Sequence, residues 1–455
     1  MSQRPDRFSS RLAFVLVTAG AAVGLGNVWG FPYIAGKNGG AGFVFVYLLA
    51  LGFVAAPIFM AELLLGRAGR GSPPMALARL QAHLGTGGPR WAIVGWVGIA
   101  ATVLILSYYS VIAGQALAYA LAAVGGAFSG WAPDRVVAYE AAFKADVGRM
   151  ALWTGLFTGL SVVIIAADIR AGLERTAKVL MPLLFVLLAV LAVYAGTVGD
   201  FSAAVDFLFG VRTADWTAHM LFEAVGQAFF TVSVGIGGIM IFGAYMGDEV
   251  RLPNATLWIV LMDLAVAILA GLAIFPLVFA APDIDPAAGP GLVYITLPTL
   301  FARLPMGSAV AALFFVLLGV AALTSAIALM APGVARLQEA GLKRPTGAVL
   351  LGLTVFGLSF LTMLSFAGWR TVYPLAGLGF DGMTFFDLIR EGVNNFVLPF
   401  GGLSFALIVG WAMPALRVRQ SLPMAEGWRF RVWYGTLRYL VPVVTGLLFL
   451  AALVP

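Results

Sequence analysis

The chain has 455 residues, of which 61% are hydrophobic and only 11% are charged, less than half of the roughly 25% found in typical soluble domains. It contains no cysteine and two histidines, which excludes disulfides, thiolate metal sites, cysteine nucleophiles and a histidine-built metal centre. The net charge is +6, and the basic residues lie between apolar runs. This position indicates membrane topology, with a lipid bilayer as the partner rather than nucleic acid.

The predicted elements are membrane-spanning helices. The run 41–61 contains no charged residue and is as long as the roughly 20 residues that a helix needs to cross a bilayer. No soluble domain interrupts the series, so residues 1–455 form a single transmembrane domain of an all-α membrane protein. We expect about eleven spans, at about 11–36, 41–66, 92–124, 150–168, 176–197, 218–246, 255–280, 306–338, 345–366, 384–413 and 430–453.

Positive charge predicts the orientation of these spans in the cell (inner) membrane, because cytoplasmic segments carry an excess of arginine and lysine. With the N-terminus inside, 19 of the 27 basic residues fall on inner segments. We therefore expect a cytoplasmic N-terminus and, from the odd number of spans, a C-terminus outside. The longest loops, near 125–149, 198–217 and 281–305, are then all outside, and the proline-rich third loop is either a structured lid or an ordinary connection.

Two spans contain glycine clusters at membrane depth. Residues 20–27 and residues 230–238 each hold three glycines beside polar residues. Each glycine weakens a helix by about 1 kcal/mol relative to alanine, which favours unwinding; close helix packing is the alternative, but it does not require the polar neighbours. Breaks in corresponding helices predict an inverted repeat of five plus five helices, about 11–197 and about 218–413, with the span at about 430–453 extra.

At these breaks the sequence resembles the neurotransmitter:sodium symporter family, and within it the bacterial amino-acid transporters. The resemblance rests on AGAAVGLGNVWGFPYIAGKNGG in the first span, GQAFFTVSVGIGG in the sixth and ALTSAIALM in the eighth, and it extends over nearly the whole chain. It implies the leucine-transporter fold and a sodium-coupled secondary transporter rather than an enzyme. It also implies two transported sodium ions, an amino-acid substrate and no cofactor.

The resemblance assigns two sodium sites. One ion would lie among the carbonyls and hydroxyls of Gly20, Val23, Ala321, Thr324 and Ser325. The other would be held, together with the substrate carboxylate, by Ala22, Asn27, Thr231 and Asp263. Without the resemblance, hydroxyls in an apolar helix would be expected to bond back to carbonyls of their own helix.

The resemblance also assigns a substrate site between the two breaks. The substrate carboxylate would meet the amides of Leu25 and Gly26 and the hydroxyl of Tyr109. Its ammonium would face carbonyls near Ala22, Phe230, Thr231 and Ser233, and its side chain would contact Val23, Ile105, Phe230, Ile236, Ser325 and Leu329. None of these residues is charged, and a buried unpaired charge is costly. We therefore expect import of a neutral, hydrophobic L-amino acid by alternating access.

The gates depart from the family pattern. Gly30 stands where the family commonly has an arginine, and the acidic partner of that arginine aligns near Arg390 and Glu391. The usual outer gate is therefore absent or rebuilt, and we expect Tyr109 and Phe230 to close over the substrate, helped by Arg390.

At the inner face, the resemblance indicates a cytoplasmic gate. Its expected members are Arg4 or Arg7 together with Tyr245 and Glu339. Phe8 replaces the tryptophan that is common there.

Two acids lie inside the spans, where ionisable groups are expensive and usually functional. Asp263 stands where the family often has an amide, so it brings a fixed negative charge to the sodium site. We therefore expect chloride-independent transport, with a proton carried outward on Asp263 after sodium and substrate leave. Glu62 either assists this charge balance or anchors the inner end of the second span. The rival function is a passive channel or a non-transporting amino-acid receptor on the same fold.

Overall fold

The structure is a computed structural model that describes residues 7–85, 90–210, 216–281, 289–369, 383–422 and 427–453. Across these residues it contains helices and connecting turns but no strand. Each of the predicted spans is helical, and the two breaks lie where the glycine clusters predict them. The all-α membrane fold is therefore confirmed.

The first half of the chain supplies five spans in order. They are formed by α1 (Arg11–Ala22) with the π-helix η1 (Gly26–Gly30) and α2 (Phe31–Lys37); α3 (Ala41–Ala50) with η2 (Leu51–Ala55) and α4 (Ala56–Gly69); α6 (Trp91–Val124); α8 (Val147–Ala166); and η3 (Ile169–Glu174) with α9 (Arg175–Val198).

The second half supplies the remaining spans. They are formed by α11 (Ala218–Thr231) with α12 (Met240–Tyr245); α13 (Leu252–Phe279); α15 (Gly307–Glu339); α16 (Arg344–Phe366); α17 (Phe385–Gly392) with η5 (Val393–Val397), α18 (Leu398–Leu407) and η6 (Ile408–Ala412); and α20 (Trp428–Gly435) with η7 (Thr436–Leu440) and α21 (Val441–Leu453).

Length and composition alone account for most of these spans. In the described ranges, nine helices are long and apolar enough to cross a membrane, and α1 with the helix Gly26–Lys37 makes a tenth if the bent pair counts as one span. The remaining predicted span, 218–246, is divided between α11 and α12 by the non-helical residues 232–239. Each of these two helices is therefore too short to cross a membrane by itself.

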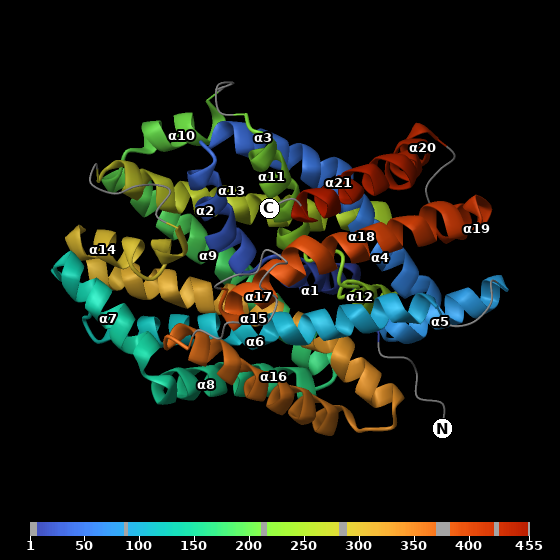
Figure 1. Ribbon diagram of the computed structural model, residues 1–455, viewed down its shortest axis with the longest axis horizontal. Helices are drawn as coiled ribbons and strands as arrows, with labels where there is room; N and C mark the ends of the chain where they lie inside the picture. The colour runs from blue at the N-terminus through green and yellow to red at the C-terminus, as the bar shows by residue number, and fades with distance from the viewer. Residues whose placement is uncertain are drawn as a thin grey trace.

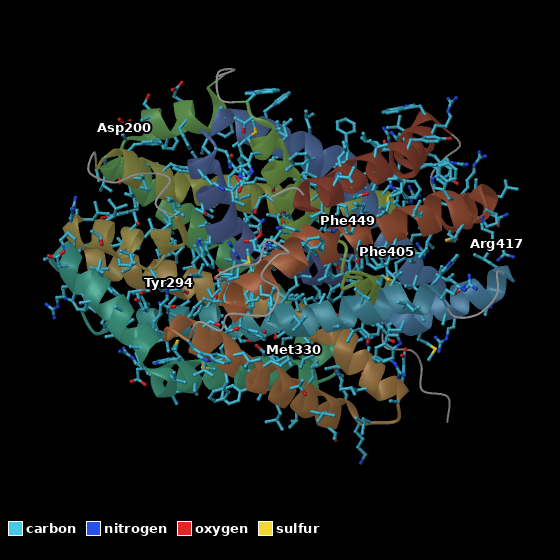
Figure 2. The ribbon with its side chains drawn as sticks, viewed as in Figure 1. Asp200, Tyr294, Met330, Phe405, Arg417 and Phe449 are labelled. Carbon is cyan, nitrogen blue, oxygen red and sulfur yellow. The ribbon has the colours of Figure 1, made fainter. Side chains whose placement is uncertain are left out.

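Short helices occupy the loops and gather at the two ends of the bundle. One end holds α7 (Pro133–Ala145), α10 (Phe201–Phe209), the 3-10 turn η4 (Gly289–Leu292) and α14 (Thr296–Arg303); the other holds α5 (Pro73–Leu84) and α19 (Ala415–Ser421) (Figure 1). Figure 2 shows Asp200 and Arg417 at these opposite ends. They were expected on the outer and inner sides respectively, so the structure separates the two sides as the charges predict. The direction of insertion stays a prediction.

Both breaks have a clear backbone cause. Between α1 and Gly26 the chain turns by 51°, and Val23 is extended at the end of α1. In the break between α11 and α12, Gly235 and Gly237 have φ values of +91° and +69°, which glycine adopts without the steric penalty of a side chain. Unwinding near residues 23 and 235 is therefore confirmed.

Other glycines let neighbouring helices approach the second break. A Cβ at Gly401 of α18 would lie 1.5 Å from the carbonyl oxygen of Gly235, and one at Gly98 of α6 would lie 2.0 Å from that of Ile236. Glycines outside the two clusters thus allow α18 and α6 to pack closely against the unwound segment. The unwound segment is enclosed by protein, as the absence of water in a bilayer requires.

The centre of the bundle is α15. The most apolar stretch of α15 is 78% buried, the largest such share among the membrane spans in the described residues. The helix runs through the middle of the molecule (Figure 1). The broken first span lies against it, which places the candidate site in the core rather than on the lipid-facing surface.

Candidate functional site

The two helix breaks face each other and are joined by buried hydrogen bonds. The Nε2 of Gln227 on α11 donates to the carbonyl of Gly26 at 2.8 Å, and the hydroxyl of Ser233 lies 3.3 Å from the carbonyl oxygen of Ala21. Within the first break, the amide of Gly24 donates to Asn27 Oδ1 at 3.0 Å. Side chains thus satisfy backbone groups that the interrupted helices leave free.

The first predicted sodium site lies where α1 meets α15. The hydroxyl of Ser325 is 2.9 Å from the carbonyl oxygen of Val23 and 3.4 Å from that of Gly20. The adjacent Thr324 donates back to the carbonyl of Ala321 at 3.0 Å, which is the local bond expected of a hydroxyl in an apolar helix. The five predicted residues are therefore brought together. They present only oxygen atoms, which hard cations prefer as ligands.

The second predicted sodium site is built on a buried amide–carboxylate contact. Asn27 Nδ2 donates to Asp263 Oδ1 at 2.7 Å and to the Asp263 carbonyl at 3.1 Å. Asp263 has no exposed surface, and its Oδ2 has no hydrogen-bond partner among the described residues. Thr231 approaches Tyr47, with 3.3 Å between the two hydroxyl oxygens. A buried carboxylate oxygen without a donor is the kind of group that a cation would satisfy.

A cavity of about 30 Å³ lies between the breaks, and ten of the twelve predicted substrate residues line it. They are Ala22, Leu25, Gly26, Ile105, Tyr109, Phe230, Ser233, Ile236, Ser325 and Leu329. Val23 and Thr231 do not line it, whereas Gly24 and Leu398 do. The sequence offered no signal for Leu398, since an apolar residue in a membrane helix is ordinarily core or lipid-facing. This volume holds about two water molecules, so the walls must move apart to admit an amino acid.

The walls of this cavity are neutral. No acidic or basic side chain is among the residues that line it. Its polar groups are the hydroxyls of Tyr109, Ser233 and Ser325 and the backbone at the breaks. The amide of Leu25 donates to the Tyr109 hydroxyl at 3.3 Å, where the helix Gly26–Lys37 begins and its free amides favour negative charge.

Glu62 lies against the second break. It is fully buried, and its Oε1 accepts from the amide of Gly235 at 2.6 Å. The geometry thus ties α4 to the unwound part of the sixth span, rather than only anchoring the inner end of α4 itself.

The predicted outer gate residues are arranged differently from the family pattern. Arg390 pairs with its neighbour Glu391, with 2.6 Å between Nη2 and Oε1. The side chain of Gln227 fills the space beside Gly30, 3.3 Å from where a Cβ would stand.

An ion pair that the sequence analysis missed lies at the outer ends of the two broken spans. Lys37 Nζ is 2.6 Å from Glu223 Oε1, and Asn38 Nδ2 donates to the other oxygen of Glu223 at 2.7 Å. This contact joins the end of α2 to α11. Lys37 and Asn38 lie in the first-span motif, but Glu223 is far away in sequence, and the motif does not indicate it as a partner.

Of the predicted inner gate residues, Arg7 and Tyr245 lie on segments that contact each other, whereas Glu339 binds Ser72. Arg7 forms an ion pair with Asp248 at 3.0 Å, whereas the carboxylate of Glu339 accepts from the amide and the hydroxyl of Ser72. Phe8 donates its amide to the carbonyl of Tyr245 at 3.2 Å. Arg4 lies outside the described residues.

Asp248 is the acidic partner that the sequence analysis missed at the inner face. It also pairs with Arg70, 2.9 Å away. The hydrogen bond and the positive charge of Arg7 lower the pKa of Asp248 below its ordinary value. Asp248 therefore stays ionised in the contact that holds the start of the first span.

The chain is similar to known proteins over nearly its whole length. The family model of the sodium:neurotransmitter symporter family matches residues 5–134 and 144–455. The chain is 32% identical to the sodium-dependent transporter YhdH of Bacillus subtilis, over 98% of each chain. It is 24% identical to the sodium- and chloride-dependent GABA transporter 2 of Homo sapiens, over 93% of this chain and 75% of that one. A crystal structure of MhsT in complex with L-phenylalanine matches with a TM-score of 0.89 and 35% identity, over 99% of this chain and 100% of MhsT.

Proposed function

This chain belongs to the sodium:neurotransmitter symporter family, and from that premise we propose that it imports a neutral, hydrophobic L-amino acid together with sodium. Its relatives are sodium-dependent transporters, so sodium is the driving ion.

The observation that carries the substrate class is the neutral cavity between the breaks. Ile105, Ile236, Leu329 and Leu398 supply apolar walls, and no charged side chain is among the lining residues. A charged substrate side chain would be buried there without a partner, which is costly. The likeness to MhsT, which was solved with L-phenylalanine, supports the same class.

The polar ends of the cavity suit the backbone of an amino acid. The substrate carboxylate lies at the amides of Leu25 and Gly26 and the hydroxyl of Tyr109. The ammonium faces the carbonyl end of the second break, near Phe230 and Ser233. Opposite charges thus meet opposite ends of broken helices, as expected of discontinuous membrane helices.

Two sodium ions accompany the substrate in this proposal. One occupies the oxygen cluster of Gly20, Val23, Ala321, Thr324 and Ser325. The other lies among Ala22, Asn27, Thr231 and Asp263, and the substrate carboxylate completes its shell. That shared contact couples sodium binding to substrate binding.

Asp263 supplies the negative charge that balances these ions. Two sodium ions and a zwitterionic substrate bring a charge of about +2 to membrane depth, where a lone charge costs at least about 2.5–3.5 kcal/mol. A buried carboxylate in the sodium site makes a bound chloride unnecessary, so transport is chloride-independent. When sodium and substrate leave, Asp263 takes up a proton and carries it outward.

During alternating access, the contacts at one end of the bundle break while the contacts at the other end hold. At the outer end the members are Phe230 and Tyr109 over the cavity and the Lys37–Glu223 pair. At the inner end the member is the Arg7–Asp248 pair. In this proposal the second end and the N-terminus are in the cytoplasm and the C-terminus is outside, as the excess of basic residues on the inner segments predicts.

The test is uptake into liposomes that hold the purified protein and carry an imposed sodium gradient. A symporter accumulates labelled L-phenylalanine or L-leucine above equilibrium, and the accumulation collapses when potassium replaces sodium. A channel would only equilibrate the substrate, and a receptor would bind it without uptake. Sodium-dependent binding of glutamate or lysine, with none of leucine or tryptophan, would refute the substrate class.

A further inference from the structure

A second cavity, of about 280 Å³, lies between α6, α15 and α16. It is larger than the cavity between the helix breaks, and no residue assigned to sodium, substrate or gating lines it. The part of α15 that carries Met330 lies between α6 and α16 in Figures 1 and 2, and Gly333 of the cavity follows three residues later. This cavity is therefore separate from the candidate site described above.

The cavity opens toward the bilayer. Trp96 and Leu350 on its rim are 48% and 47% exposed, whereas Leu351 at its floor is 7% exposed. All three residues belong to helices long and apolar enough to cross a membrane. An exposed hollow on such helices is a groove that lipid can enter, and we call it the α6–α15–α16 groove.

The groove runs along the first turns of α6 and α16. Thr354 is ten residues after the start of α16 and Ile99 is eight residues after the start of α6. At about 1.5 Å per residue these positions lie about 15 and 12 Å along their helices. Half of a hydrocarbon core about 30 Å thick is about 15 Å. The groove is therefore long enough to take much of an acyl chain from the leaflet on the side where α6 and α16 begin.

A guanidinium group without a carboxylate partner marks the headgroup end of this groove. Arg336 lies over the ring of Trp96, with 5.0 Å from its Cζ to the ring centroid. In the part of the chain that the structure describes, it forms no ion pair, since the carboxylate of Glu339 on the same helix is taken by Ser72. Stacking on an aromatic face leaves the N–H edge of the guanidinium available to an anion.

The surroundings favour a phosphate at that edge. Lys343 is exposed at the start of α16, so a second positive charge is near the same end of the groove. Basic pockets between membrane helices on the cytoplasmic side suit anionic lipid headgroups, and this end is the one that the basic residues assign to the cytoplasm.

We propose that the α6–α15–α16 groove binds one anionic phospholipid of the inner leaflet. Its acyl chain lies along the apolar floor at Leu351 and Gly333, and its phosphate meets Arg336. An elongated apolar groove on membrane-spanning helices fits an acyl chain better than a soluble ligand, and the unpaired positive charge favours an anionic over a zwitterionic headgroup. This inference does not depend on the transported substrate.

The experiment is native mass spectrometry of delipidated full-length protein exposed to equal amounts of phosphatidylglycerol and phosphatidylcholine. Wild type should retain phosphatidylglycerol in preference to phosphatidylcholine. In Arg336→Gln the retained phosphatidylglycerol should fall about fivefold, from the attraction of one basic residue near an anionic surface. The matched control is Arg429→Gln, because Arg429 also stacks on a tryptophan, at 5.8 Å from the ring of Trp428, and does not line the groove.

A second variant tests the groove itself. Thr354→Trp places a large side chain in the groove from an exposed position, so it should reduce lipid retention while thermal unfolding stays at the wild-type temperature. Unchanged phosphatidylglycerol retention in Arg336→Gln, equal retention of both lipids by wild type, or equal loss in Arg429→Gln would overturn the proposal. A dimer that Thr354→Trp dissociates would assign the groove to a second copy and would also overturn it.

Discussion

Gly24 offers a direct perturbation of the candidate site. It lines the cavity, and a Cβ added there would lie 2.4 Å from Ser325 Oγ and 2.9 Å from Tyr109 Oη. Both distances are well inside van der Waals contact, so in Gly24→Ala the Ser325 side chain must turn or α1 must shift away from α15. Either movement breaks the 2.9 Å contact between Ser325 and the carbonyl of Val23.

The magnitude follows from the cost of overpacking. Forcing an extra methyl group into a packed interior costs about 1–3 kcal/mol, which is about 5-fold to 150-fold in a binding constant. The methyl group also takes space that the substrate needs. We expect the affinity for L-phenylalanine in saturating sodium to fall within this range, and the sodium concentration for half-maximal binding to rise.

The assay is equilibrium binding of labelled L-phenylalanine at a series of sodium concentrations, with thermal unfolding measured on the same samples. The matched control is Gly226→Ala on α11, where nothing lies within 4 Å of the added Cβ. That variant should bind as wild type does and unfold at the same or a slightly higher temperature. If Gly24→Ala binds both sodium and L-phenylalanine with wild-type affinity, the placement of the site is refuted.

Four further predictions address sodium, the lid, chloride and the inner contact. Replacing Thr324 and Ser325 together with alanine should sharply weaken sodium-dependent binding, and an unchanged sodium titration would contradict the first ion site. Phe230→Ala should raise the dissociation rate of labelled substrate in a chase experiment, because the ring closes the cavity; an unchanged rate would require a different lid. In liposomes with gluconate replacing chloride, wild type should continue to transport and Asp263→Asn should gain a chloride requirement, whereas a wild type that stops would contradict the role of Asp263. Because the pKa of Asp248 is lowered in the folded state, its contribution to stability is complete above its ordinary pKa of 3.8 and is lost as the pH falls through the folded value. The difference in unfolding temperature between wild type and Asp248→Asn should therefore shrink below about pH 4; a constant difference would show that the charge contributes nothing.

The spans and the breaks could be predicted because their signals are local. A helix such as α15 is recognised by the length of its apolar run, and the first break by three glycines within residues 20–27. Short helices were harder. The sequence predicts loops at 125–149 and 198–217, although both contain recognisable helix start signals. These are Pro133 at the start of α7 and Asp200, whose carboxylate accepts from the amide of Ala203 at 2.9 Å.

The end contacts could not be predicted because they depend on the tertiary arrangement. Glu339 was a reasonable partner for Arg7 by charge alone, yet Arg7 meets Asp248 after α12 instead. Lys37 and Glu223 are 186 residues apart, and nothing in the first-span motif that contains Lys37 indicates Glu223 as its partner. Long side chains at the ends of spans have several partners of the right charge, and only the relative positions of the helices decide among them.

The amides at the helix breaks are held by side chains rather than by a helical hydrogen-bond ladder. The amide of Gly24 bonds to Asn27, and the amide of Gly235 bonds to Glu62. Hydrogen exchange reports how often such a bond opens, whatever its acceptor. Slow exchange at these glycines would therefore measure the integrity of the polar contacts around the site, not the presence of regular helix. Deuterium uptake at the breaks can in this way follow the opening of the site without a substrate or a label.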